Sequence, residues 1–252
     1  VTTIESGAFR NCTNVKSLII PESVTTIGTY AFKNCTSLTT VTFEGNSQLK
    51  VIESGAFEKC VSLTSIDIPE GTTELGDDVF DYCSSLKTVE LPDSVLSIGD
   101  YNFAGCTSLV EITVDNNNQH YSNDEDGILF NKDKTTMYYF PAGLKIEKYK
   151  VPDTVTLLDG WTFYGNICIC EIYIPESVEE INIAGTFDLC LNLTSITVDP
   201  QNSVYSSDEY GVLFNKDKTR IVNYPADRRG TSYEIPASVM CFDALSFNVN
   251  EH

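Results

Sequence analysis

Apolar residues recur along the chain in one short pattern. Its clearest copy is IPESVTTIGTYAFKNCTSLTTVTF at residues 20–43, where a Phe anchor is followed at three residues by Cys, at six by Leu, and at nine and eleven by Val and Phe. Anchors separated by 23 to 25 or by 60 residues lie at Phe9, Phe32, Phe57, Phe80, Phe103, Phe163, Phe187 and Phe247. A unit this short cannot close a core alone, so the pattern predicts stacked repeats.

Each repeat divides into two halves. The second half reads Leu-x-x-Ile-x-Ile, the alternation of a half-buried strand, and Pro often follows it and ends pairing. The first half, Ala-Phe-x-x-Cys, is too short for a stable isolated helix and predicts a one-turn helical or irregular arc. We therefore expect an α/β repeat solenoid with a parallel β-sheet on one face and short arcs on the other.

Two longer segments interrupt the short repeats. Residues 115–163 match 199–247 at a constant offset of 84, and each copy holds the run Leu-Phe-Asn-Lys-Asp-Lys-Thr, at 129–135 and 213–219. Two apolar strand residues that lead into a polar turn predict a β-hairpin. We expect one solenoid over 1–252, with short repeats in 1–114 and superrepeats at about 115–198 and 199–252, the second truncated. Because Val1 falls inside a repeat, we expect a trimmed chain whose leader or anchor lies elsewhere.

The repeat at 20–43 resembles the BspA-like (Treponema-type) class of leucine-rich repeats. The segment YSNDEDGILFNKDKTTMYYFPAG at 121–143 is similar to an insert that recurs in such proteins. The resemblance implies a right-handed leucine-rich-repeat coil, a secreted or cell-surface location, and a role in adhesion or protein binding. It supplies no shared catalytic residues.

Charge narrows the range of partners. The chain has 36 acids against 16 bases, a net charge of −20 and a pI near 4.3. Such a surface repels phosphate backbones and anionic lipids, which argues against nucleic-acid and membrane-surface partners. No stretch approaches the roughly 20 apolar residues of a membrane span, so we expect no direct membrane insertion.

The two inserts, 115–152 and 199–236, differ from the rest of the chain. They hold 10 of the 16 bases and 12 of the 36 acids, so their net charge is −2 against −18 elsewhere, and they hold eight of the 13 tyrosines. Tyr suits recognition because it offers a large amphipathic surface at low entropic cost. The candidate ligand-binding tyrosines of the inserts are Tyr121, Tyr138, Tyr139, Tyr205 and Tyr224. The alternative is that these rings pack inside enlarged coils.

The outward positions of the repeated strands form a second candidate surface. They carry hydroxyls and acids, which could meet a basic or hydrogen-bonding protein. The candidates are Glu90, Glu111, Glu171 and Tyr173. The alternative is a merely soluble sheet face, where Thr is favoured by its strand propensity.

The remaining chemistry is sparse. Six of nine Cys share one repeat position that Asn166 and Asn250 occupy elsewhere, which predicts buried free thiols, whereas Cys168 and Cys170 are expected at exposed positions where they could oxidise. The run Asp124–Gly127 lacks the spacing of a calcium loop and predicts a solvated turn.

Only two His occur, His120 and His252, and no nucleophile elbow or phosphate loop is found, so we expect no catalytic residues, no metal and no cofactor. The function predicted is a non-enzymatic surface or secreted repeat protein that binds a protein of a host or neighbouring cell. The alternatives are a glycan-binding module and a passive spacer.

Overall fold

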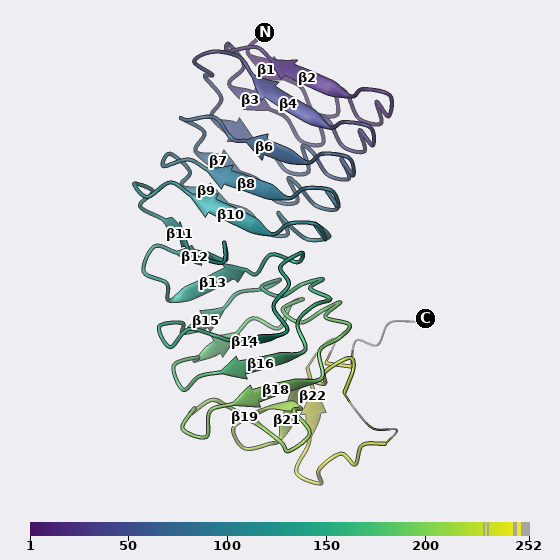
Figure 1. Cartoon of the computed structure of the whole chain (residues 1–252), viewed down its shortest axis with the longest axis vertical. Helices are drawn as coiled ribbons and strands as arrows, with labels where there is room; N and C mark the ends of the chain where they lie inside the picture. Colours follow the sequence, from purple (N-terminus) through teal and green to yellow (C-terminus); the bar gives the residue numbers. More distant parts are fainter. Residues whose placement is uncertain (229, 231, 244–245, 248–252) are drawn as a thin grey trace. The chain divides into compact units, whose positions relative to one another are not determined.

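The computed structural model describes residues 1–228, 230, 232–243 and 246–247. The chain forms two compact units, residues 1–132 with 141–143 and residues 133–140 with 144–252. Each unit is a stack of β coils (Figure 1). The expectation of one solenoid built from 84-residue superrepeats stays a prediction, and Asn250 and His252 lie outside the described residues.

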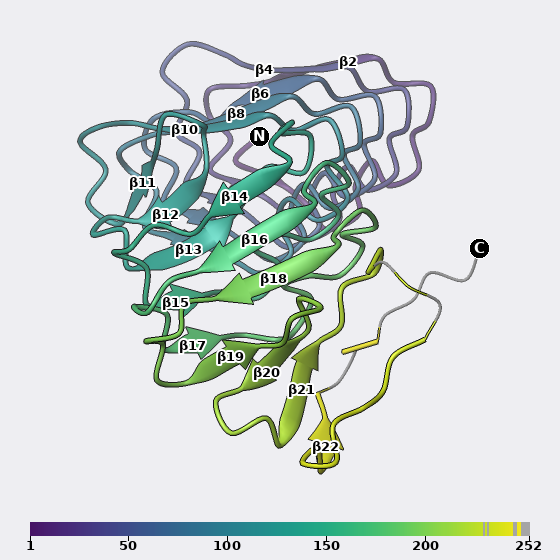
Figure 2. The same ribbon diagram turned by 60° about the horizontal axis from the view of Figure 1, so that its bottom comes forward.

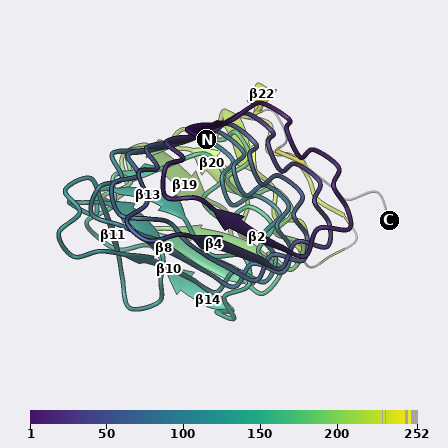
Figure 3. The ribbon, with the colours of Figure 1, turned by 90° about the horizontal axis from the view of Figure 1, so that it is seen from above.

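Each coil of the first unit contributes a short and a longer strand. The short strands form a five-stranded parallel sheet whose members are β1 (Thr3–Ile4), β3 (Thr26–Ile27), β5 (Val51–Ile52), β7 (Glu74–Leu75) and β9 (Ser97–Ile98). The longer strands are those that the Leu-x-x-Ile-x-Ile pattern predicts, and in the view from above β2, β4, β8 and β10 lie close to one another (Figure 3). They form two parallel sheets, β2 (Ser17–Ile20) with β4 (Thr40–Phe43), and β6 (Ser65–Asp67) with β8 (Thr88–Leu91) and β10 (Glu111–Val114). The sequence analysis missed the two-residue strands.

The insert of the first unit begins with an antiparallel pair, β11 (Tyr121–Asn123) and β12 (Leu129–Asn131). In the second unit, one parallel sheet runs through β13 (Thr136–Tyr139), β15 (Leu157–Leu158) and β17 (Glu180–Ile181). Another joins β14 (Lys148–Lys150), β16 (Glu171–Ile174) and β18 (Ser195–Val198) (Figure 2). The second insert holds β19 (Tyr205–Ser207), β20 (Leu213–Asn215) and β21 (Arg220–Asn223), with β22 (Cys241–Phe242) parallel to β21. The antiparallel β20–β21 pair confirms the hairpin predicted at 213–219.

The arcs are not helical, so the α/β class and the helical arcs were wrong: the described residues contain no helix. Along each arc, successive backbone N–H groups bond alternately to the next coil and to a carbonyl within their own turn. The Phe57 N–H donates to the Val79 carbonyl of the next coil at 2.9 Å, whereas the Glu58 N–H closes a turn onto Gly55 at 3.0 Å. Left-handed residues such as Asn34 and Lys59 recur in the arcs. An α-helix instead bonds each amide to the residue four before it, and left-handed residues cannot continue it.

Stacked Phe rings fill the core of the first unit. The rings of the first five anchors stack in order, with centroids 5.2 to 6.0 Å apart and planes within 14° of parallel. In the second unit Phe163 stacks on Phe187 at 5.9 Å. The insert coils supply rings of their own, because Phe140 lies 5.4 Å from Phe163 and Tyr224 stacks on Phe247 at 5.0 Å. Their repeat positions carry no small residue–Phe signature, so the sequence did not reveal them.

The repeated Cys side chains confirm the free-thiol prediction. Every Cys is free, and the thiol of Cys83 donates to the Phe57 carbonyl at 3.2 Å. Four other thiols make the same bond, each to the anchor carbonyl of the preceding coil, over 3.0 to 3.2 Å: Cys35, Cys60, Cys106 and Cys190. A buried thiol thus satisfies a carbonyl between coils.

Candidate functional site

The outward face of β6, β8 and β10 carries the clearest cluster of charge. Ile66, Val89 and Ile112 point into the core, so their neighbours along each strand face solvent. We call this surface the acidic strand face; its exposed members are Ser65, Asp67, Thr88, Glu90 and Glu111. The burial pattern confirms the predicted alternation and places Glu90 and Glu111 at the surface.

Strand register brings two carboxylates of this face together. Asp67 is the direct partner of Glu90, and like charges in opposed positions destabilise a sheet. Within the described part of the chain, no ion pair involves Asp67, Glu90 or Glu111. The face therefore holds uncompensated negative charge on a fixed backbone.

More acids lie where these strands end. Desolvation, followed by a hydrogen bond with Asp93 and the charges of Asp115 and Glu90, raises the pKa of Glu70 above its ordinary value. Smaller contributions to this shift in pKa come from repulsion by the neighbouring carboxylates. A cation placed among them would relieve that repulsion.

A hollow of about 690 Å³ lies between β4 and β6, next to this face. These two strands are neighbours in the coil order but belong to separate sheets. We call this hollow the β4–β6 slot. Its lining residues are Thr40, Val41, Thr42, Phe43, Gly45, Asn46, Ser47, Ser65, Ile66, Asp67, Ile68, Pro69 and Glu70. Hydroxyls and carboxylates supply most of its polar groups. The sequence analysis did not foresee this slot.

Three of the candidate tyrosines are buried, which corrects the expectation that they could contact a ligand. Tyr121, Tyr139 and Tyr205 are 8%, 5% and 5% exposed. The hydroxyl of Tyr121 accepts the Ile98 N–H at 3.0 Å, and that of Tyr205 accepts the Ile181 N–H at 2.9 Å. These two rings fasten each insert to the edge strand of the preceding coil, as the alternative interpretation proposed.

Tyr138 and Tyr224 are half-buried. Desolvation, and then the charge of Asp159, raises the pKa of Tyr138. Arg228 lies against Tyr224: its guanidinium is 5.3 Å from the ring centroid and its Nε donates to the hydroxyl at 2.6 Å. Tyr224 thus has a structural role: its ring stacks on Phe247 and its hydroxyl accepts a hydrogen bond from Arg228.

Arg228 lies among three rings. Its guanidinium is also 5.3 Å from the centroid of Tyr210 and 5.0 Å from that of Tyr233, whose hydroxyl donates to Asp208 at 2.7 Å. A hollow of about 600 Å³ beside these side chains is also lined by Glu234. Tyr210 is 52% exposed and was not among the candidates. The offset of 84 could have drawn attention to it, because Asp126 occupies its position in the first insert.

On the strand face of the second unit, charges are paired. The Lys148 Nζ lies 2.8 Å from a carboxylate oxygen of Glu171. The hydroxyl of Tyr173 donates to Asp199 at 2.6 Å, and Lys150 lies over the Tyr173 ring at 5.8 Å. These candidates lie together, as the strand pattern predicted, but their charge is neutralised within the chain, unlike that of the acidic strand face.

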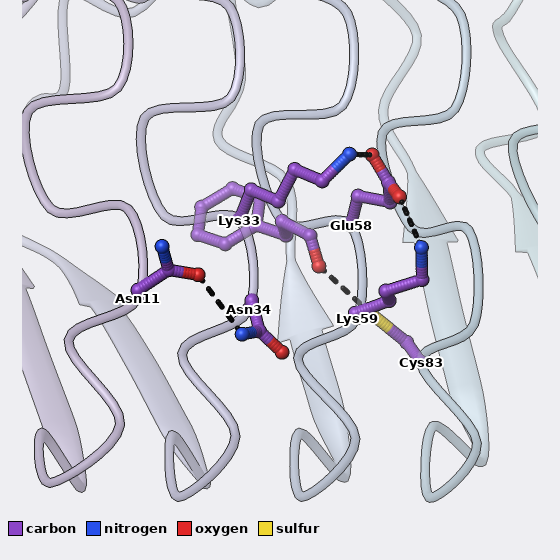
Figure 4. A network of polar contacts seen from close by, with 7 residues as sticks. Asn11, Lys33, Asn34, Glu58, Lys59 and Cys83 are labelled. Carbon is purple, nitrogen blue, oxygen red and sulfur yellow. Dashed lines mark hydrogen bonds and ion pairs between the residues drawn. The ribbon is translucent and has the colours of Figure 1, made fainter.

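The arcs of the first unit carry another polar network (Figure 4). Glu58 forms ion pairs with Lys33 and with Lys59, the latter at 2.9 Å, and the Asn34 amide donates to the Asn11 side-chain oxygen at 2.9 Å. Desolvation acts to raise the pKa of Glu58, but hydrogen bonds from the two lysines outweigh it, so this pKa lies below its ordinary value. Because Glu58 is paired with two lysines, the network stabilises the arc and presents no unpaired carboxylate to a ligand.

The acidic run at 124–127 forms a turn. Asp124 accepts the N–H groups of Asp126 and Ile128 at 3.1 and 3.0 Å, which supports the predicted turn. Across the described ranges, no group of three or more His, Cys, Asp and Glu side chains could hold a metal ion. In the same ranges, no helix has the length and apolar character needed to cross a membrane. Cys168 and Cys170 are half-buried rather than exposed.

Comparisons with known proteins agree with the fold. The family model described as the BspA type leucine rich repeat region matches six copies over residues 2–124 and 133–225. A leucine-rich repeat protein from Eubacterium ventriosum is similar, with 27% identity, 78% of this chain and 57% of that chain covered, and a TM-score of 0.64. The pneumococcal vaccine antigen PcpA is also similar, with 26% identity, 78% of this chain and 56% of that chain covered, and a TM-score of 0.62.

A leucine-rich cell surface protein from Faecalibacterium prausnitzii gives 26% identity, 78% and 64% coverage, and a TM-score of 0.50. The chain spans somewhat more than half the length of the first two structures. No curated protein matches it.

Proposed function

This chain belongs to the BspA-type leucine-rich repeat family, and from that premise we propose that it is a non-enzymatic binding protein whose acidic strand face receives a basic surface of another protein. Leucine-rich repeats generally serve as protein-interaction modules, since their stacked strands present broad surfaces. The proposal joins that general role to one particular face of the first unit.

The opposed carboxylates of Asp67 and Glu90 are the observation that carries the proposal. Their repulsion persists in the isolated protein because no cation of the described chain pairs with them. A basic partner would replace that repulsion with attraction, and complementary potentials raise both association rate and specificity. The strand face of the second unit lacks this property, because Glu171 and Tyr173 already have partners.

We further propose a secreted or cell-surface location and a role in adhesion to a host or neighbouring cell. Two similar structures support it: one is described as a vaccine antigen and another as a cell surface protein. The net charge of −20 also favours basic protein partners over nucleic acid. Flow cytometry of intact source cells with an antibody raised against this chain tests the location, and labelling only after lysis would oppose it.

Binding to an array of immobilised peptides tests the proposed face. We expect the wild-type chain to prefer Lys- and Arg-rich peptides, and the double variant Glu90→Gln, Glu111→Gln to bind them about tenfold more weakly at low salt. The control is Glu74→Gln, Asp100→Asn, which removes the same charge from exposed positions outside the acidic strand face. Equal losses in the two variants would show that net charge, and not this face, determines binding.

Tyr210 favours a second candidate function, glycan binding by the second unit. Its ring is half exposed beside a hollow lined by Arg228 and Glu234, and sugars are bound by aromatic faces flanked by charged hydrogen-bonding groups. A glycan array tested with the wild-type chain and with Tyr210→Ala checks this candidate. A signal unchanged in the variant would count against it.

A further inference from the structure

The β4–β6 slot lies beside an insertion that the sequence places at one site. The anchors Phe32 and Phe57 are 25 residues apart, whereas the neighbouring spacings are 23. The loop after β4 carries the extra length and turns at Gly45, whose φ is +48°. It bonds backward: the Glu44 N–H donates to Ile20 at 2.9 Å and the Gln48 N–H donates to Glu22 at 2.8 Å. Its side toward β6 is left open.

The gap between β4 and β6 is confined to the strand face, because the same coils stay joined elsewhere. On the other sheet of the same coils, β3, β5 and β7 remain paired, with Thr26 opposite Val51 and Val51 opposite Glu74. The rings of Phe32 and Phe57 stay stacked at 5.2 Å. Only the long strands part, since β2–β4 and β6–β8–β10 are separate sheets. The coils thus stay joined at the core while a slot opens on the strand face.

The lining of the slot suits a cationic side chain. Thr40, Thr42 and Ser65 bring hydroxyls, and Asp67 and Glu70 bring carboxylates. The edges of β4 and β6 that face each other are not hydrogen-bonded neighbours, so backbone carbonyls there can accept bonds from a guest. Of the described residues that line the slot, none is Lys or Arg. A volume of about 690 Å³ lies in the range of small-ligand sites.

We propose that the β4–β6 slot receives an arginine side chain from a basic segment of the partner protein. Arginine fits because its planar guanidinium presents five donors to carboxylates, hydroxyls and carbonyls at once, whereas lysine offers a compact ammonium with three. This inference rests on the proposed function and adds to it a residue type and a docking point. The rest of the basic segment lies along the acidic strand face.

Titration of the whole chain with three probes tests the slot: a peptide with one central Arg among neutral residues, the same peptide with Lys, and N-acetylarginine amide. We expect the Arg peptide to bind most tightly, about tenfold better than the Lys peptide. Ser65→Lys, which places an ammonium in the slot, and Asp67→Asn should each weaken Arg-peptide binding about tenfold. Thr88→Lys is the matched control, since Thr88 lies on the same face but outside the slot.

A closing variant provides an independent check. Deleting Asn46 and Ser47 restores the 23-residue spacing, so β4 and β6 should pair, their amides should gain protection from hydrogen exchange, and Arg-peptide binding should disappear. Equal losses from Ser65→Lys and Thr88→Lys would overturn the slot and leave the acidic strand face standing. Equal affinity for the Lys peptide would do the same. If N-acetylarginine amide binds as tightly as the Arg peptide, the slot is a site for a small guanidinium compound, and the proposed protein segment is overturned. Failure of these three probes, while Lys- and Arg-rich peptides still bind, would overturn the slot alone; failure of the Lys- and Arg-rich peptides as well would overturn both proposals.

Discussion

Replacing Phe80 by Ala tests the ring stack on which the first unit depends. Phe80 is fully buried and stacks on Phe57 and on Phe103, each at 6.0 Å. Burial of this kind places the cost of Phe→Ala at about 3–5 kcal/mol, and two stacking partners place it toward the upper end. The backbone bonds of residue 80 survive the change, including the thiol bond from Cys106 at 3.1 Å. The measured loss therefore reports the ring.

Phe9→Ala is the matched control. Phe9 is 41% exposed and, among the described residues, its ring stacks only on Phe32, so its loss should be about 1–2 kcal/mol. Urea unfolding gives the magnitudes, and native-state hydrogen exchange shows where stability falls. Because each coil contacts only its neighbours, amides of β7 and β9 should lose protection while those of β16 and β18 keep it. A loss below about 1.5 kcal/mol for Phe80→Ala, or equal loss of protection in both units, would refute the reasoning.

Three further predictions concern charge, backbone and thiols. Desolvation, with the charges of Asp78 and Glu58, raises the pKa of Asp81 from 3.8 to about 7. Between these two pH values the folded state holds a proton that the unfolded state has lost, so the free energy of unfolding should fall as pH rises from 4 to 7. The variant Asp81→Asn should show a flatter dependence of melting temperature on pH in thermal scans. Gly211→Ala should lower stability by at least about 2 kcal/mol more than Gly165→Ala in urea titrations: both glycines have left-handed φ, but only at Gly211 would a new Cβ meet another residue, 2.3 Å from the Ser195 Cβ. An Ellman titration of the native chain should label Cys241 quickly, since it is exposed, and label five thiols only on unfolding, since they are buried: Cys35, Cys60, Cys83, Cys106 and Cys190. The first expectation fails if the wild type and Asp81→Asn show the same pH dependence. The second fails if the two glycine variants lose equal stability, and the third if all thiols of the native chain are labelled quickly.

The sequence predicted the parts of the fold that depend on periodic burial. Alternation along β6, β8 and β10 identified Glu90 and Glu111 as outward, and the spacing of 23 to 25 residues between the first five Phe anchors anticipated the stack. The sequence left the arcs either helical or irregular, because their bonding depends on backbone conformation, with Asn34 and Lys59 left-handed, which composition does not reveal. The short strands were missed since two residues are too few to show a period.

The candidate site was predicted less well for a different reason. Tyr121 and Tyr205 looked suited to ligands, but a Tyr hydroxyl can equally accept a buried backbone N–H, and only three-dimensional proximity decides. The β4–β6 slot was hidden in a change of spacing from 23 to 25, which reads as a loop insertion. Its effect on strand pairing appears only once the register on the opposite sheet is known.

The alternating amides of the arcs bear on how such a chain can diversify. Main-chain hydrogen bonds such as that between Phe57 and Val79 join the coils there, so exposed side chains that make no bond between coils can change without loosening the stack. Glu58 is constrained, because it is 6% exposed and pairs with both Lys33 and Lys59. Mutation can therefore change much of the exposed surface of the first unit while its interior stays constant.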